Sequence, residues 1–188
     1  MDEDKRIFLY RIDSRDIIEL VNDEWLSFAA ENSYSAGKDA FINHLLWEFI
    51  IDAETRELYK IILEKVRRNN AKFEIPFRCD SPSCRRFMKL EIRSEERESV
   101  LFVSNIVRTE LRDSVKLMET DVERSDQFLT MCSWCKRIKT AEFEWLEVED
   151  AVLKLRLFEE ERLPRLTHGI CTTCKENVMK QCGLSGKK

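Results

Sequence analysis

The sequence predicts an α+β fold, in which one antiparallel sheet carries helices on one face and is followed by a connector helix and a small metal-bound module. Three observations lead to this prediction. Strand-like segments occur as a group of two and a group of three, with helical segments between them. A heptad pattern follows, and two Cys-x2-Cys pairs lie in the last third of the chain. These features divide the chain into residues 1–108, 109–131 and 132–182.

The first elements are two strands and a short helix. Residues 7–12 and 17–21 are rich in strand-forming side chains, and a polar turn cluster at 13–16 separates them. This arrangement predicts a β-hairpin. Asn22 or Asp23 then provides an N-cap for a short helix that contains Trp25.

Helix and strand signals alternate in the next part of the chain. Asp52 is a suitable cap for a long helix whose apolar residues follow a 3.6-residue period. Residues 73–77 and 86–93 alternate apolar with polar side chains, and 100–106 is the last strand-like run. Pro76 predicts an edge strand or a bulge, because proline has no N–H to donate to a neighbouring strand.

Residues 109–131 carry an a/d heptad stripe. Its members are spaced 4, 3, 4, 3 and 4 residues apart, with one polar break at Ser125. The strict 3.5-residue period favours a helical pair over a helix packed on its own sheet. We therefore expect a homodimer through 109–131. The stripe consists of Leu111, Val115, Met118, Val122, Ser125 and Leu129.

The cysteine-rich module carries the strongest chemical signal. Cys132 and Cys135 form one Cys-x2-Cys pair, and Cys171 and Cys174 form the other. Two such turns supply the four sulfur ligands of a tetrahedral site, which zinc usually occupies, so we expect one zinc per chain. A site closed by four sulfurs is structural, because no position remains for substrate. His168 could replace one cysteine or donate a hydrogen bond to a sulfur.

Disulfides, a thioredoxin-type redox pair and inert buried thiols are the rival interpretations of these cysteines. The chain starts with charged residues instead of a secretory apolar segment, and no run of about 18 apolar residues is present. We therefore expect a cytoplasmic protein without a membrane span. In that compartment, paired cysteines are more often metal ligands or redox groups than structural bridges. A thiol-based redox switch that uses the zinc-bound cysteines stays as the alternative function.

A second candidate site lies at the turn after Pro76. Its turn signal around Asp80 predicts that the two cysteines beside it flank a hairpin loop and face each other. The three nearby arginines could bind an anion, or lower the thiol pKa of a redox pair. The alternative is an exposed hairpin tip whose arginines pair with carboxylates. The residues of this possible anion or redox loop are Arg78, Cys79, Asp80, Cys84, Arg85 and Arg86.

Charge and motif content argue against two classes of function. Charged residues make up 36% of the chain, and its net charge is −4. This balance creates no basic field, so we do not expect nucleic-acid binding. The sequence contains neither a phosphate-binding Gly-rich loop nor a His-Glu-x-x-His motif, and it contains only two histidines. We therefore expect a protein that is not an enzyme.

The order of two strands, short helices and three strands resembles a PAS sensor domain, with Asn-Asp-Glu-Trp at 22–25 near its start. The chain is also similar to bacterial stand-alone PAS-like proteins, which carry segments like Leu-Leu-Trp-Glu-Phe at 45–49 and Pro-Phe-Arg-Cys-Asp-Ser-Pro at 76–82. Residues 131–138 and 167–174 resemble a tail of some bacterial sensor kinases and response regulators. The resemblance implies a PAS fold, a sensory or scaffold role with a signalling protein as partner, and a pocket ligand of unknown identity.

Overall fold

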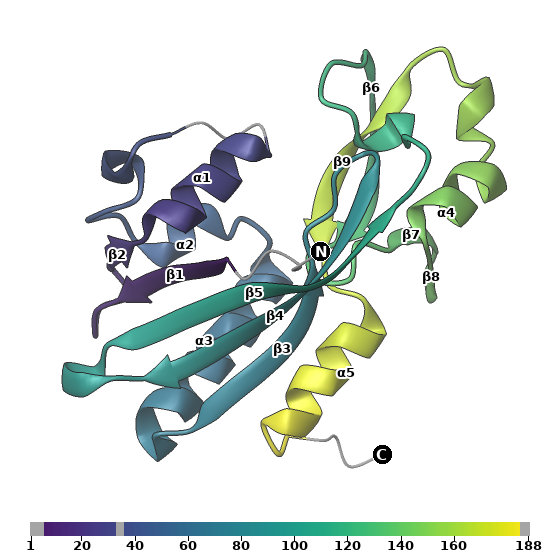
Figure 1. The fold of residues 1–188 in the computed structure, drawn as a ribbon. Helices are drawn as coiled ribbons and strands as arrows, with labels where there is room; N and C mark the ends of the chain where they lie inside the picture. The colour runs from purple at the N-terminus through teal and green to yellow at the C-terminus, as the bar shows by residue number, and fades with distance from the viewer. Residues whose placement is uncertain (1–5, 33–35, 185–188) are drawn as a thin grey trace.

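The computed structural model describes residues 6–32 and 36–184. Its N-terminal sheet consists of β1 (Ile7–Ile12), β2 (Ile18–Val21), β3 (Lys72–Arg78), β4 (Cys84–Ser94) and β5 (Val100–Leu111). The strands are antiparallel throughout and lie in the order β2-β1-β5-β4-β3 (Figure 1). This sheet confirms the predicted group of two strands followed by a group of three. Pro76 lies on β3, an edge strand, as its missing N–H requires.

Helices α1 (Asp23–Glu31), α2 (Leu46–Phe49) and α3 (Ala53–Asn69) separate β2 from β3, and short 3₁₀ turns occupy Lys38–Ala40 and Glu96–Glu98. Both predicted caps are confirmed. The Asn22 side chain accepts a hydrogen bond from the Trp25 N–H at 3.0 Å, and the Asp52 side chain accepts one from the Thr55 N–H at 2.6 Å. Each cap satisfies an N–H group that the first helical turn leaves without a partner.

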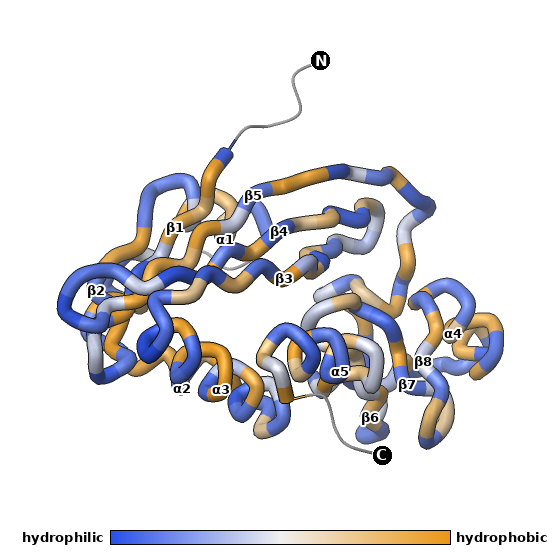
Figure 2. The backbone as a smooth tube through the Cα atoms, turned by 90° about the horizontal axis from the view of Figure 1, so that it is seen from below, coloured by the Kyte–Doolittle hydropathy of each residue, from blue (hydrophilic) through white to orange (hydrophobic). Residues whose placement is uncertain are grey.

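The amphipathic face of α3 forms the main core with the sheet. Leu58, Ile62 and Val66 follow the helical period and are almost completely buried, as are Ile92 and Phe102 on the strands. Figure 2 shows α2 and α3 along the same side of the sheet. The predicted α+β architecture with helices on one face is therefore confirmed. No described helix combines the length and the apolarity that are needed to cross a membrane.

The C-terminal part is built around a second sheet. Strands β6 (Arg124–Cys132), β7 (Ile138–Ala141), β8 (Glu144–Leu146) and β9 (Leu163–Gly169) lie in the order β8-β7-β6-β9, and β6 runs parallel to β9. Helix α4 (Val148–Lys154) lies between β8 and β9, and α5 (Thr172–Gln181) follows β9. Two further 3₁₀ turns occupy Lys116–Met118 and Leu157–Glu159.

The predicted connector helix is wrong. Residues 109–131 continue β5, pass through a 3₁₀ turn and enter β6, and they contain no α-helix. Their apolar residues instead enter a second core, in which Val115 and Leu117 pack with Met131 of β6. The heptad spacing is misleading because β6 is stabilised by β9, a segment far along the chain that no local period reveals. The prediction of a homodimer consequently loses the helical pair on which it depended.

The cysteine module shares its core with the N-terminal sheet. Cys132, Trp134, Ile170 and Val178 belong to the same buried cluster as α3 and the inner face of the sheet. Cys182, just beyond α5, is also part of this cluster and is completely buried. The two parts of the chain therefore form one packed body, in which the module covers the end of the sheet (Figure 1).

Candidate functional site

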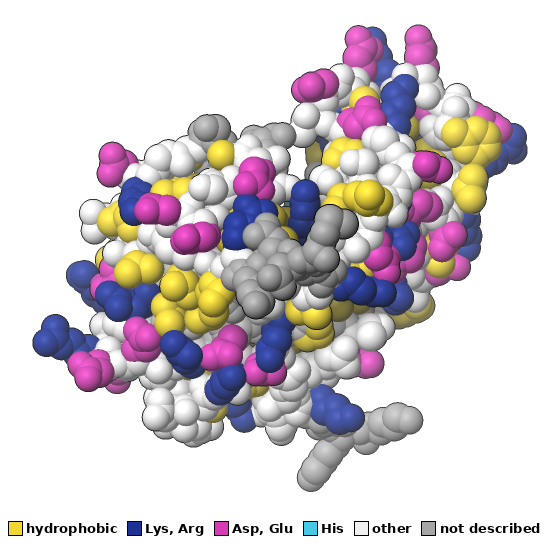
Figure 3. Space-filling view, in the orientation of Figure 1, with side chains coloured by type: hydrophobic (Ala, Val, Ile, Leu, Met, Phe, Trp, Pro, Cys, Tyr) yellow, Lys and Arg dark blue, Asp and Glu magenta, His cyan; other side chains and the backbone are white. Residues whose placement is uncertain are grey.

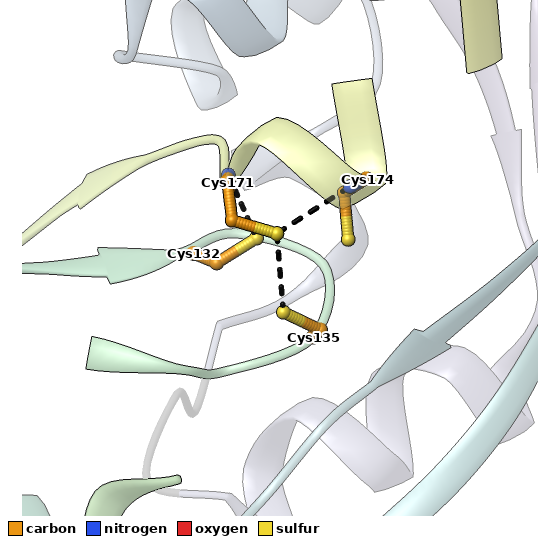
Figure 4. Close-up of side chains that lie close together, drawn as sticks. All are labelled: Cys132, Cys135, Cys171 and Cys174. Atoms are coloured by element: carbon orange, nitrogen blue, oxygen red, sulfur yellow. Dashed lines mark hydrogen bonds between the residues drawn. The ribbon is translucent and has the colours of Figure 1, made fainter. Parts of the chain in front are cut away.

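Parallel pairing of β6 with β9 brings the two Cys-x2-Cys pairs together. Cys132 ends β6, and Gly169, its partner in the register, ends β9 two residues before Cys171. Cys135 follows in the turn after β6, while Cys174 lies in the first turn of α5. The four sulfur atoms lie within 4.8 Å of one another (Figure 4). The predicted set of four cysteines is thus assembled at one point.

The spacing of the sulfur atoms fits a tetrahedral metal site. Four thiolates at about 2.3 Å from one zinc ion would lie about 3.8 Å apart. The Sγ atoms of Cys135 and Cys171 are 3.6 Å apart, and all seven cysteines of the chain are free thiols. A disulfide would require about 2.05 Å between sulfurs. The donor set is therefore suited to zinc, with all four positions of the tetrahedron supplied by the chain.

Backbone N–H groups point at two of these sulfurs. The N–H of Cys171 donates to the sulfur of Cys132, and the N–H of Cys174 donates to the sulfur of Cys171, both at 3.4 Å. Hydrogen bonds from Cys135, Cys171 and Cys174 hold the pKa of Cys132 well below the usual thiol range. The hydrogen bond with Cys132 is in turn the largest cause of the raised pKa values of Cys135 and Cys174. The cluster therefore stabilises negative charge on the sulfur of Cys132, whereas Cys135 and Cys174 hold their protons more tightly.

His168 lies outside this group of four sulfurs. It is an exposed residue near the end of β9, and its side chain faces the neighbouring cavity. Although much of the residue is exposed, desolvation of its imidazole by the surrounding protein is the largest cause of its lowered pKa, and the charge of Lys136 lowers the pKa further. The metal set that the described residues support is consequently the four cysteines.

A cavity of about 510 Å³ lies between the N-terminal sheet, the helices and the cysteine module. Sites for small molecules commonly measure about 300–1,000 Å³ and have mostly apolar walls. Most of the wall comes from residues 10–79 of the N-terminal part, but Ser133 and Trp134, which lie between the first two cysteines, close one side. The Trp134 ring is 6.0 Å from that of Tyr59, at nearly a right angle. The metal turn therefore forms part of the cavity wall.

A second cavity, of about 320 Å³, lies on the other side of Trp134. It is bordered by β3 and by one side of α5 along its length, and three of the four cluster cysteines line it. These are Cys135, Cys171 and Cys174. Small solutes consequently have a route to the sulfurs.

The arginines of the predicted anion loop are bound to groups of the protein. Arg78 is buried and pairs with Asp80 and with Glu147 of the cysteine module. Arg85 pairs with Glu149 at 2.7 Å. Arg86 donates to the Asn32 side chain and to the carbonyl of Cys79. Carboxylates and carbonyls of the chain therefore pair with part of each of these guanidinium groups, while the Nε of Arg85 is buried without a hydrogen-bond partner. The anion site stays a prediction.

The two cysteines of this loop do not face each other. Cys79 donates its N–H to the carbonyl of Arg86, whereas Ser81 pairs with Cys84. Burial raises the pKa of Cys79 despite the positive charges of Lys136 and Arg86. A reactive thiol requires a lowered pKa. The geometry and the acid–base properties both argue against a redox pair at this turn.

Charges of both signs are mixed on the surface of the protein. In Figure 3, lysine and arginine side chains are interspersed with aspartate and glutamate over the face that is drawn. Many of these charges form ion pairs across the strands, such as Lys72 with Glu91 at 2.6 Å and Lys89 with Glu74 at 2.7 Å. A nucleic-acid interface would instead need a continuous basic surface.

Comparisons with known proteins place the chain only loosely. No protein-family model matches the sequence, and no curated protein matches it. A C-terminal domain from Streptococcus mutans aligns with a TM-score of 0.43 and 15% identity, over 54% of this chain and 76% of that one. A sensory box sensor histidine kinase from Vibrio cholerae aligns with a TM-score of 0.41 and 12% identity, over 54% of this chain and 82% of that one.

Several residues of the cavity carry no local signal in the sequence. Tyr10, Tyr59 and Trp134 come from β1, α3 and the metal turn, and they meet only because the chain folds. Burial raises the pKa of the Tyr10 hydroxyl well above its usual value, and it raises that of Tyr59 as well. Both hydroxyls therefore stay protonated and can act as hydrogen-bond donors.

Proposed function

We propose that this chain is a cytoplasmic, PAS-like sensory or scaffold protein that works in signalling without catalysis. In this proposal, Cys132, Cys135, Cys171 and Cys174 hold one structural zinc ion, and the adjoining cavity takes a small ligand. The observation that carries the proposal is that the turn of the metal site also forms part of the cavity wall. Trp134 lies between two cluster cysteines and also borders the cavity of about 510 Å³.

The structural role of the metal is supported by its surroundings. Cys132 is completely buried, and Cys171 is nearly so. Both belong to the main core, so a metal at this point would connect β6 and α5 to the N-terminal sheet. Metal binding at a site of this kind contributes directly to the stability of the fold.

A partner-docking role for the module is supported by exposed aromatic side chains. Phe128, Phe143 and Phe158 lie on the module and are 62%, 85% and 64% exposed. Aromatic residues are enriched in protein interfaces. The proposal therefore includes a protein partner that binds the cysteine module and responds to the state of the cavity.

Mass spectrometry of the reduced protein, under native and denaturing conditions, tests the metal half of this proposal. We expect the native mass to exceed the denatured mass by one zinc ion per chain, and the same spectrum reports the oligomeric state. Cys171→Ser should lose the metal, whereas Cys79→Ser, which changes a half-buried thiol outside the cluster, should keep it. A wild-type chain without metal, or a Cys171→Ser variant with full zinc content, would contradict the proposal.

The redox alternative is favoured by the second cavity, because three cluster sulfurs border it. In that case, peroxide would oxidise two thiolates to a disulfide, take up two protons and leave as two water molecules, with release of the zinc ion. A chelating dye would detect zinc release at micromolar peroxide. Retention of zinc at such doses would leave the structural role as the better explanation.

A further inference from the structure

We propose that the cavity of about 510 Å³ binds a small apolar carboxylate, whose carboxylate lies against Lys136 of the metal turn and whose body lies among the aromatic side chains. This inference rests on the proposed function, because it assigns a class of ligand to the sensory cavity. Four features of the cavity support it: an aromatic body, a cation without a carboxylate partner, the compensation of the remaining charges, and the position of the cation beside the metal cluster.

The apolar part of the cavity wall is formed by aromatic side chains that pack against one another. Trp25 meets Phe41 edge to face, with ring centroids 4.7 Å apart, and Phe41 lies 5.5 Å from Phe49. On the opposite side, Tyr59 packs edge to face on Trp134. Preformed aromatic walls favour the apolar part of a ligand, with little cost for ordering side chains.

Lys136 supplies the cation. It follows Cys135 directly, and its φ of 62° places it in the left-handed region, where the chain turns back toward β7. Its ammonium group donates to the carbonyl of Ser133 at 3.0 Å. Among the described residues, no carboxylate lies within 4.0 Å of it. An ammonium group has three protons to donate, so two remain for a ligand.

The other ionisable groups at the cavity are already compensated. Arg78 is paired with Asp80 and Glu147. The Asp52 carboxylate accepts the Thr55 N–H at the start of α3, where the helix dipole offsets negative charge. His168 has a lowered pKa and is therefore neutral near pH 7. Lys136 is thus a cationic side chain at the cavity wall that no described carboxylate pairs with, and its remaining N–H groups favour an anionic head group as a hydrogen-bond partner.

This position of the head group connects the ligand to the metal. Ser133, Trp134 and Lys136 all line the cavity, and they alternate with the cluster residues Cys132 and Cys135 along one turn. The metal site fixes the backbone conformation of this turn. A ligand that contacts the turn therefore binds best when the metal is present. By linkage, ligand and metal then stabilise each other.

Calorimetric titration of the zinc-loaded chain tests the proposal with three probes that share one body. These are 3-phenylpropionate, 3-phenylpropanol and 3-phenylpropylamine. We expect the acid to bind roughly tenfold more tightly than the alcohol, as is typical of a hydrogen bond to a charged group. The amine should bind most weakly. Equal affinities, or preference for the amine, would overturn the proposal.

Matched variants locate the head group. Lys136→Gln should abolish the preference for acid over alcohol, and Lys136→Asn, which suits a left-handed backbone, provides a second test if the first variant folds poorly. Lys139→Gln changes an exposed lysine of the same module and should leave the preference intact. Unchanged preference in both Lys136 variants would overturn the assignment.

The outcomes also separate this inference from the proposed function. A chain that carries one zinc ion and binds none of the three probes overturns the ligand class and leaves the metal module in place. A chain that prefers the acid but carries no zinc keeps the ligand site and contradicts the metal half of the proposed function alone.

Discussion

Trp134 is the residue at which the cysteine cluster meets the cavity of about 510 Å³. Its side chain is 4% exposed and borders both cavities, while its backbone carbonyl accepts the N–H of Arg78 at 2.6 Å. The neighbouring cysteines fix this turn from the module side, and Arg78 fixes it from β3. A displacement of the metal turn would therefore change the shape of the cavity without requiring a hinge between separate domains.

Cys182 illustrates the difference between a cysteine that packs and a cysteine that binds metal. It is completely buried beside α3, and burial raises its pKa. We expect Cys182→Ser to lower the free energy of unfolding by about 1–2 kcal/mol, because a hydroxyl group replaces a weakly polar thiol in the core. Zinc content should stay at one ion per chain. Urea denaturation and metal analysis measure the two effects, and loss of zinc in this variant would instead make Cys182 a ligand.

At the scale of elements, the sequence predicted those helices and strands whose conformation depends mainly on neighbouring residues. The alternation in residues 73–77 and the Asp52 cap predicted β3 and the start of α3, because these signals depend on neighbouring residues. The four cysteines also carry their own spacing signal. The strand β6 could not be predicted in this way, since its partners β7 and β9 decide its conformation. Similarly, no local pattern indicates that Lys136 and Tyr59 line one cavity.

The close packing of β6 on β9 can be tested at Gly169. A Cβ atom at this position would lie 2.9 Å from Cγ2 of Thr130, which is closer than side-chain packing permits. We expect Gly169→Ala to destabilise the protein by about 1–3 kcal/mol, since the Thr130 side chain and the part of β6 that carries it must shift. Because these strands carry the two Cys-x2-Cys pairs, zinc affinity should fall as well.

The matched control for this prediction is the double variant Gly169→Ala/Thr130→Ser. Serine lacks the methyl group that the new Cβ would meet, so the double variant should recover most of the lost stability and zinc affinity. Denaturation of both single variants and the double variant gives the interaction energy between the two positions. Additive effects would show that the strain at Gly169 has another source.

At the scale of the whole molecule, ion pairs hold the cysteine module against the sheet. Arg78 of β3 meets Glu147 of the module at 2.5 Å, and Arg112, just after β5, meets Glu149 at 2.8 Å. The Arg78 and Arg112 side chains are both only 8% exposed. Pairs of this kind are geometrically specific, and breaking one side leaves a buried charge. They therefore fix the orientation of the module, which the shared apolar core alone would specify less closely.

This contact should weaken in acid. Burial raises the pKa of Glu147, but its ion pairs with Arg78 and Arg137 outweigh burial, so the pKa lies below the ordinary value of 4.5. A carboxyl group with a lowered pKa stabilises the folded state above its unfolded pKa, and the contribution is lost as the pH falls through the folded pKa. We therefore expect Glu147→Gln to cost about 1–2 kcal/mol at pH 7 and progressively less below pH 4.5. Thermal unfolding of both proteins between about pH 3 and pH 7 measures this difference.

Acid also protonates the cysteine ligands, so the comparison must separate the two effects. Wild type and Glu147→Gln have the same four thiols, and any loss of metal in acid therefore cancels in the difference between their stabilities. Glu142→Gln, which alters an exposed carboxylate of the same module, should follow the wild-type curve at every pH. A stability difference for Glu147→Gln that persists unchanged at pH 3 would mean that this side chain acts by packing and not by charge. A difference that closes in acid would identify the Arg78–Glu147 pair as an electrostatic contact that holds the metal module, and with it the cavity wall, against the sheet.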